Sequence, residues 1–125
     1  MAKLDFKALI EKIFAINSDI RYVAVADSKF QLIESRMRET VPTMSSEKVD
    51  ADFFSWVPSV MIEGVSKISQ YAGSVKAVVI RYEKLLAIYI PAEKNVVALT
   101  VNRSAAASAF NIADSVGTLI GQEVT

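Results

Sequence analysis

Residues 75–101 have the sequence VKAVVIRYEKLLAIYIPAEKNVVALTV, in which three apolar runs are separated by two short charged turns. Each turn contains a Glu-Lys pair, at 83–84 and at 93–94. Short runs rich in valine, isoleucine and tyrosine, bounded by turn residues, are typical of consecutive β-strands. We therefore expect three antiparallel strands, within residues 75–83, 84–91 and 95–101.

A further pair of strands is expected earlier in the chain. Residues 20–26, IRYVAVA, are apolar on both faces, and residues 30–37 combine apolar side chains with polar ones. Asp27, Ser28 and Lys29 lie between the two runs and are expected to form a hairpin turn. The polar far end of 30–37 indicates an edge strand, because charge there discourages pairing with other chains.

Three segments have the periodicity of amphipathic helices, namely residues 3–16, 53–71 and 104–121. Pro58 conflicts with the middle helix, since proline costs about 3 kcal/mol in a helix interior. That helix is expected either to kink or to be split there. Gly73 suits the position after its last turn, and Asn102 or Ser104 can cap the last helix. A loop is expected over 38–51.

The resulting order, α-β-β-α-β-β-β-α, predicts an α+β fold: a five-stranded antiparallel sheet with helices on both faces. The chain has 125 residues and fits a single domain, residues 1–125. Hydrophobic residues make up 52% of it, and the mean hydropathy is +0.31, which is high for a soluble domain of this size. We expect the sheet to be buried on both faces and some apolar surface to meet a partner.

The composition argues against several classes of partner. The formal net charge is zero, with 14 basic and 14 acidic residues, so nothing drives binding to a nucleic-acid backbone. No apolar run approaches the roughly 18 residues of a membrane span, and the first residues lack the apolar region of a signal peptide. We therefore expect a cytoplasmic protein without membrane insertion. With no cysteine, the chain has neither disulfides nor thiolate metal sites.

The sequence also offers little for catalysis. It contains no histidine, which is the commonest general base, and no phosphate-loop, dinucleotide-binding or nucleophile-elbow motif. We expect no enzyme activity, no cofactor and no metal. An enzyme that uses Glu34 and Arg36 with a bound metal is the weakest alternative, because the spacing provides no cluster of convergent carboxylates.

Two groups of residues are candidates for contact with a partner. A cluster of charged residues lies at the end of the second predicted strand and consists of Glu34, Arg36, Arg38 and Glu39. They form either a docking patch or a solvated edge whose charges prevent aggregation, and the second interpretation is favoured. The middle helix begins with three aromatics within four residues, Phe53, Phe54 and Trp56, which is more than one helix face can bury.

The order of elements resembles the roadblock/LC7 family, the dynein-light-chain-like modules that also occur as bacterial and archaeal GTPase regulators. The resemblance lies in the opening helix LDFKALIEKIFAI, the hairpin IRYVAVADSKFQLIESRM, the helix FFSWVPSVMIEGVSKISQY and the three late strands. It covers residues 4 to 120 and looks closest to small archaeal members, while the profilin and longin folds share a related architecture. The chain departs from the family at Ser28-Lys29, where a glycine is common, and in a longer middle segment that contains Pro42 and Pro58.

The resemblance implies a homodimer, or a heterodimer with a related chain, in which the third strand and second helix of two subunits join the sheets into one. Here these elements are residues 75–82 and 53–68. Strand 75–82 is apolar on both faces and has no proline, so as an edge it would invite strand addition. The expected interface residues are Phe53, Phe54, Trp56, Val57, Val60, Met61, Val75, Ala77, Val79 and Arg81.

The function implied is a non-catalytic dimerisation and scaffolding module that binds or regulates a small Ras-like GTPase or a larger protein complex. A small-molecule sensor is the alternative, because folds of this shape can hold a ligand between sheet and helix. The pocket of such a sensor would be lined by Tyr22, Tyr82, Tyr89 and Arg36.

Overall fold

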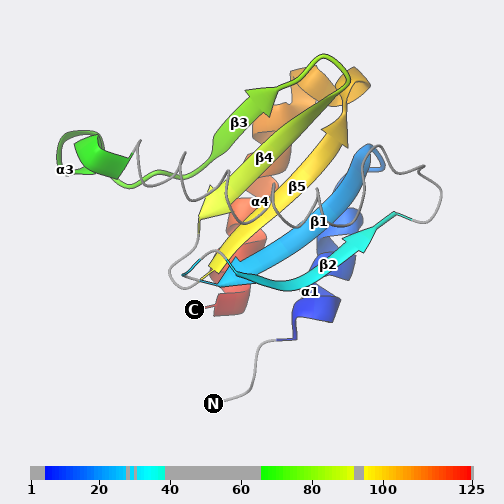
Figure 1. The fold of residues 1–125 in the computed structure, drawn as a ribbon, viewed down its shortest axis with the longest axis horizontal. Coiled ribbons are helices and arrows are strands. Elements are labelled where there is room, and N and C mark those ends of the chain that lie inside the picture. Colours follow the sequence, from blue (N-terminus) through cyan, green and yellow to red (C-terminus); the bar gives the residue numbers. More distant parts are fainter. Residues whose placement is uncertain (1–4, 28, 30, 39–65, 92–94, 125) are drawn as a thin grey trace.

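The computed structural model describes residues 5–27, 29, 31–38, 66–91 and 95–124, which form a five-stranded sheet with accompanying helices (Figure 1). Every neighbouring pair of strands is antiparallel, and the order across the sheet is β2-β1-β5-β4-β3. The predicted α+β fold is therefore confirmed. The elements are α1 (Phe6–Phe14), β1 (Ile20–Asp27), β2 (Leu32–Met37), the 3₁₀ turn η1 (Ser66–Ile68), α3 (Ser69–Ala72), β3 (Val78–Arg81), β4 (Leu85–Pro91), β5 (Asn95–Asn102), the 3₁₀ helix η2 (Arg103–Ser108) and α4 (Ala109–Val124).

The predicted middle helix is described only at its end. The loop expected over 38–51 and the helical segment from 53 to 65, with Pro58, lie outside the described residues. Residues 66–72 are helical, as predicted, and Gly73 ends α3 with its N–H donating to the Ser69 carbonyl at 2.8 Å. The φ of Gly73 is +86°, a conformation that favours glycine, so the predicted role of this residue is confirmed.

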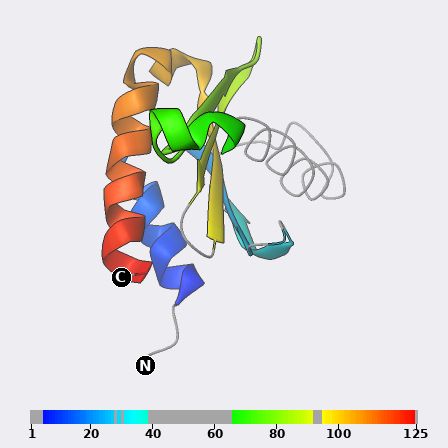
Figure 2. The ribbon, with the colours of Figure 1, turned by 90° about the vertical axis from the view of Figure 1, so that its left-hand side faces the viewer.

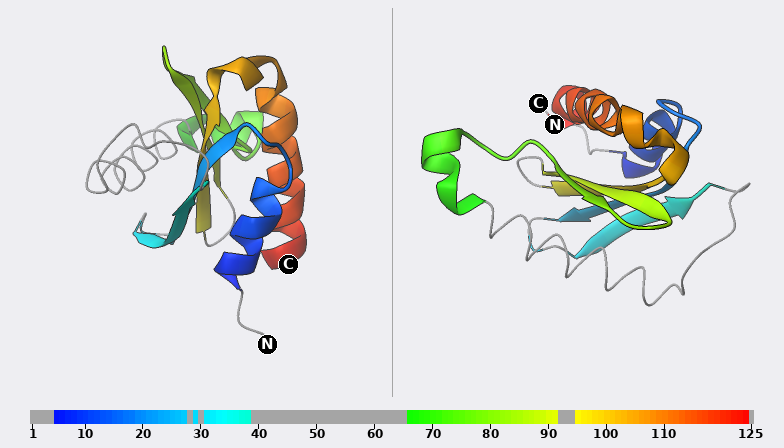
Figure 3. Two further views of the ribbon diagram at one scale, coloured as in Figure 1. Left: turned by 90° about the vertical axis from the view of Figure 1, so that its right-hand side faces the viewer. Right: turned by 90° about the horizontal axis from the view of Figure 1, so that it is seen from above.

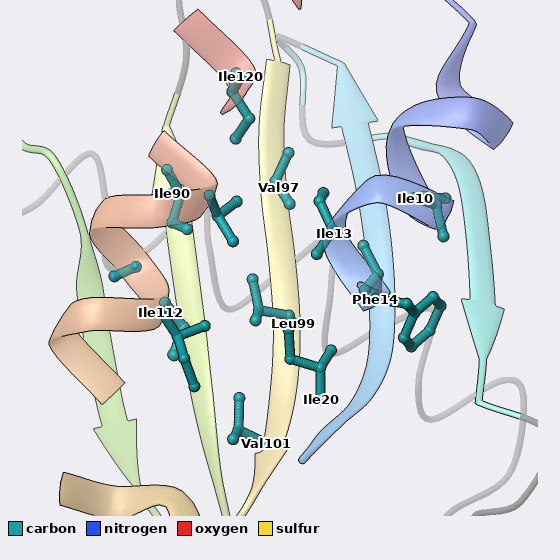
Figure 4. Packing of buried hydrophobic residues seen from close by; sticks show 14 of the residues in the cluster. Ile10, Ile13, Phe14, Ile20, Ile90, Val97, Leu99, Val101, Ile112 and Ile120 are labelled. Atoms are coloured by element: carbon teal, nitrogen blue, oxygen red, sulfur yellow. The ribbon is translucent and has the colours of Figure 1, made fainter. Parts of the chain in front are cut away.

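One face of the sheet packs against α1 and α4, which lie side by side (Figures 2 and 3). Alternate residues of β1, β4 and β5 point toward the helices because side chains alternate between the faces of a strand. Full burial of each such aliphatic side chain contributes roughly 1.5–3 kcal/mol. Figure 4 shows this cluster, and its members include Ile10, Ile13, Phe14, Ile20, Ile90, Val97, Leu99, Val101, Ile112 and Ile120.

The opposite face of the sheet carries a second buried cluster, formed by Tyr22, Ala24, Ala87, Tyr89, Val96 and Ala98. The expectation that both faces of the sheet are buried is therefore confirmed. The strand register places Ala24 opposite Ala98 and Ala87 opposite Thr100, in neighbouring rows across β1, β5 and β4. Small side chains at the centre of a face allow a packed element to approach the sheet closely.

The helices begin and end at residues that satisfy their free backbone groups. Asp5 caps α1, since its carboxylate accepts the Ala8 N–H at 3.1 Å. Of the two predicted caps of the last helix, Asn102 or Ser104, Asn102 does precede η2, but its side chain makes no capping bond. The Asn102 amide instead joins two side chains near the start of β1: its oxygen accepts from Arg21 at 2.7 Å and its nitrogen donates to Asp19 at 3.0 Å. The Ser104 hydroxyl also donates to Asp19, at 3.4 Å.

Candidate protein-interaction surface

Strand β3 forms one edge of the sheet and pairs only with β4 among the described strands. Its apolar residues are half-buried and face both ways. Val79, with the preceding Ala77, packs against the cluster under α1 and α4, whereas Val78 and Ile80 pack against the cluster on the opposite face. Arg81, at the end of the strand, is exposed. β3 therefore presents an apolar edge with one charge at its end.

The backbone of β3 offers hydrogen-bonding groups along this edge. In the turn after β3 the Tyr82 N–H donates to the Leu85 carbonyl at 2.9 Å, and the ladder continues with Arg81 opposite Leu86. Hydrogen-bonded and non-hydrogen-bonded pairs alternate along an antiparallel ladder. Val79 and Arg81 therefore fall at non-hydrogen-bonded pairs, and their N–H and C=O groups point away from β4.

The helix α3 lies beyond this edge and stands away from the sheet (Figures 1 and 3). Two of the large apolar side chains near it are exposed to an unusual degree: Tyr71 exposes 85% of its surface and Ile68 exposes 63%. Exposed apolar surface rimmed by polar residues is typical of protein interfaces. The β3 edge and α3 together form the β3 surface, defined as residues 68–82.

The opposite edge of the sheet, β2, is attached to α1 by Arg38. Its Nε donates to the Ile20 carbonyl at 2.7 Å, and its NH2 group donates to the carbonyls of Phe14 at 2.9 Å and Asn17 at 3.1 Å. The last carbonyls of a helix have no partner within the helix, and this arginine satisfies the one at Phe14, the last residue of α1. Arg38 thus joins β2, the end of α1 and the start of β1.

Arg36 reaches the same helix from the next position on that face of β2. Its guanidinium forms an ion pair with the Glu11 carboxylate of α1. The guanidinium carbons of Arg36 and Arg38 lie 5.0 Å and 4.9 Å from the centroid of the Phe14 ring, so the ring has a cation–π contact with each. We call Phe14, Arg36 and Arg38 the β2 clamp.

The sequence-predicted interface residues are only partly described. Phe53, Phe54, Trp56, Val57, Val60 and Met61 lie outside the described residues. Val75 is half-buried and precedes β3, and Ala77, Val79 and Arg81 follow it along the same edge. In the predicted docking patch, Glu34 and Arg36 share the α1 face of β2, since they pair with Val25 and Val23 of that face. Arg38 makes the backbone contacts described above.

The four side chains predicted to line a ligand pocket are divided between the two faces of the sheet, because Arg36 is separated from the tyrosines. Tyr22 and Tyr89 are buried on the face away from α1, whereas Arg36 contacts α1 on the other face. Burial, reinforced by the neighbouring Tyr82, raises the pKa of Tyr89 above its usual value, and burial also raises the pKa of Tyr82. Both phenols are therefore neutral at physiological pH.

Two further features concern metals and membranes. Among the described residues there is no group of three or more acidic, histidine or cysteine side chains that could hold a metal ion. Within the same part of the chain, no helix is both long enough and apolar enough to span a bilayer.

The sequence did not reveal the contacts of Arg38, or the contacts among Arg21, Asn102 and Asp19. Arg38 lies 24 positions from Phe14, and Asn102 lies 81 positions from Arg21. No spacing rule connects residues so far apart. Among the exposed residues of the candidate surface, only Tyr71 could be found from the sequence, because it is an aromatic residue at the end of the predicted middle helix.

The fold is that of roadblock/LC7 domains. A roadblock/LC7 domain from Streptomyces avermitilis superimposes with a TM-score of 0.66 at 14% identity, covering 99% of this chain and 100% of that one. The gliding protein MglB of Thermus thermophilus gives a TM-score of 0.67 at 11% identity, covering 93% of this chain and 88% of that one. MglB of Myxococcus xanthus gives 0.68 at 9% identity, covering 92% and 90%. No family model and no curated protein matches the chain in sequence.

Proposed function

We propose that this chain is a non-catalytic dimerisation and scaffolding module, in which two copies pair through the β3 surface. The pair would present a composite surface to a small Ras-like GTPase or to a larger protein complex. A related roadblock-like chain in place of the second copy is the variant of this proposal. Its cytoplasmic location and its similarity to archaeal proteins stay predictions from the sequence.

The observation that carries the proposal is the open edge at β3. An unpaired strand edge exposes hydrogen-bonding groups to other chains, and proteins normally protect such edges with charge, proline, bulges or a covering element. Among the described residues there is no proline or bulge in β3 and no element that covers its edge, and Arg81 at its end is the one charge of the strand. The exposed Tyr71 and Ile68 belong to α3 and η1, which precede β3 in the chain, and they add apolar surface for a partner to bury.

The known structures with this fold support association between copies. One of them is described as MglB with a tetrameric arrangement, and it superimposes with a TM-score of 0.64 at 11% identity over 94% of this chain and 88% of that one. Self-association is therefore attested among proteins of this fold. The GTPase partner rests on the resemblance to a family that includes GTPase regulators.

Light scattering behind a size-exclusion column, over a concentration series, tests the proposal. We expect a stable mass of roughly twice 13.7 kDa. The Trp56→Ala variant should weaken association, since the resemblance places the helix that contains Trp56 in the interface and tryptophan is prominent among interface residues that dominate binding energy. Phe110→Ala is the matched control, because Phe110 is an exposed aromatic on α4, which is not part of the β3 surface. A monomer at high micromolar concentration, with Trp56→Ala behaving as wild type, would show the proposal to be wrong.

A further inference from the structure

The geometry of β3 restricts how two copies can pair. Val79 and Arg81 direct their backbone groups outward, and by the same alternation so does Ala77 just before the strand. Hydrogen-bonded antiparallel partners must both direct their groups into the shared edge. A symmetric dimer therefore places one residue opposite its own copy on the two-fold axis. The central candidates for that residue are Val78, Val79 and Ile80.

An axis at Ile80 produces unfavourable charge pairs. It sets Lys76 opposite Lys84 of the partner subunit, and both side chains are exposed in this chain. Like charges directly opposite each other on neighbouring strands are destabilising. The same register sets Ala77 opposite the partner's Glu83, which leaves a small apolar side chain against a carboxylate.

An axis at Val78 pairs apolar side chains with charged ones. Ile80 would face Lys76 of the partner subunit, and Arg81 would face Val75 of the partner subunit. Ile80 packs on the cluster of the sheet face away from α1, so a lysine beside it extends that apolar surface poorly. This register has no like-charge pair, but it sets apolar residues of the edge opposite charged ones instead of opposite each other.

An axis at Val79 avoids the like-charge pair and keeps the large aliphatic side chains opposite one another, although it sets Ala77 opposite Arg81 of the partner subunit. Val79 meets Val79 of the partner subunit, and Val78 meets Ile80 of the partner subunit twice, once on each side of the axis. Aliphatic pairs of this kind are the stabilising unit of a sheet. The cluster against which Val78 and Ile80 pack then continues into the partner's cluster across the joint.

The same register gives a role to two residues outside the sequence-predicted interface. Lys76 faces Tyr82 of the partner subunit, where the ammonium group can lie on the ring and its aliphatic stem can pack beside it. Tyr82 is 40% exposed and Lys76 is exposed in this chain, so both are accessible to a partner. Such pairing would extend β3 by two residues, through Ala77 to Lys76.

We infer that the two copies meet in the register that puts Val79 on the two-fold axis, with Lys76 opposite the partner's Tyr82. This inference rests on the proposed dimer and specifies its geometry. It predicts which residues of β3 lie close enough to be joined covalently across the interface.

Single cysteines provide the test, because the chain contains no cysteine of its own. Val79→Cys should form a disulfide-linked dimer under mild oxidation, since directly opposed residues have Cα atoms about 5.5 Å apart. Val78→Cys and Ile80→Cys should not link to themselves, because diagonal Cα atoms are about 8 Å apart. A mixture of these two variants should link to each other, as the intact mass of the product on a non-reducing separation would show.

The possible outcomes distinguish a wrong register from a wrong dimer. Self-linking of Ile80→Cys or of Val78→Cys, with light scattering still showing a dimer, would replace the register and leave the proposed function standing. A dimer that links at none of the three positions would overturn the pairing through β3. A monomer in light scattering, without links, would overturn the proposed function as well.

Charge reversal gives a second readout with a matched control. Lys76→Glu should raise the dimer dissociation constant roughly tenfold, because two contacts with Tyr82 are lost. Lys84→Glu, an equal charge change in the adjacent turn, should leave the dissociation constant unchanged. Tightening of the dimer by both variants would instead indicate the axis at Ile80, where the two lysines face each other.

Discussion

The two edge strands of the sheet, β2 and β3, differ in the features that discourage pairing with another chain. The β2 edge carries Glu34 and Arg36 and contains a register shift opposite Val25 and Ala26. It is also attached to α1 by the β2 clamp. The β3 edge has apolar residues on both faces and one terminal charge. Charges and bulges discourage strand addition, so the chain protects one edge and leaves the other suitable for a partner.

The largest effect is expected at the centre of the β2 clamp. Phe14→Ala should lower the free energy of unfolding by about 3–5 kcal/mol, because it removes a buried ring and leaves a cavity between α1 and β2. Urea denaturation followed by circular dichroism measures the change. Phe110→Ala is the matched control: 72% of that side chain is exposed, so the change should stay within about 0.5 kcal/mol. Equal losses in the two variants would mean that Phe14 is not anchored as described.

The next largest effect is expected on dimerisation, and it distinguishes the β3 edge from the β2 edge. Val79→Pro should weaken dimerisation by roughly 100-fold, or about 3 kcal/mol, since it removes an outward N–H from each copy and adds a ring at the joint. The ladder with β4 should persist, because that N–H points away from β4.

Ser35→Pro makes the same change at the other edge. The Arg38 N–H donates to the Arg21 carbonyl at 2.8 Å, and by alternation the Ser35 N–H points away from β1. The dissociation constant of this variant, measured by light scattering over a dilution series, should match wild type. Loss of the dimer in Ser35→Pro but not in Val79→Pro would reverse the assignment of the two edges.

The smallest effects distinguish the two arginines of the clamp. Arg38→Ala should cost about 2–3 kcal/mol of unfolding free energy, because its charged donors satisfy three carbonyls near the end of α1. Arg36→Ala should cost no more than about 1 kcal/mol, since its ion pair with Glu11 is roughly half-exposed. Arg38→Lys should recover little, as an ammonium group cannot reproduce the planar fork of donors. A larger loss in Arg36→Ala than in Arg38→Ala would contradict this ranking in the same denaturation assay.

Much of the fold could be predicted from local pattern. The five strands follow from short apolar runs and their turns, and the Asp27 turn is typical: its carboxylate accepts the N–H groups of Lys29 at 2.8 Å and Gln31 at 3.0 Å. The edge position of β2 follows from its charges, and the conformation of Gly73 from its place after a helix. In each case the physical cause lies within a few residues of the observed feature.

The candidate surface was predictable in part. The sequence predicted a strand with two apolar faces over residues 75–82, and the structure has it over the shorter range Val78–Arg81. The resemblance gave that strand its role as an interface. The sequence did not show that α3 stands away from the sheet, or which backbone groups of β3 point outward. Those properties depend on the pairing of β3 with β4 and on the register of that pairing.

Within the described residues, then, the sequence by itself determined which segments become strands and helices, and which faces of them are apolar, because periodicity and turn chemistry act locally. Only the tertiary structure decided that β5 lies between β1 and β4, and that Arg38 completes the end of α1. It also decided that Asn102 joins Arg21 to Asp19 instead of capping a helix. These contacts join residues that are distant in the chain, and they form because buried polar groups need partners wherever the packed core brings them within reach.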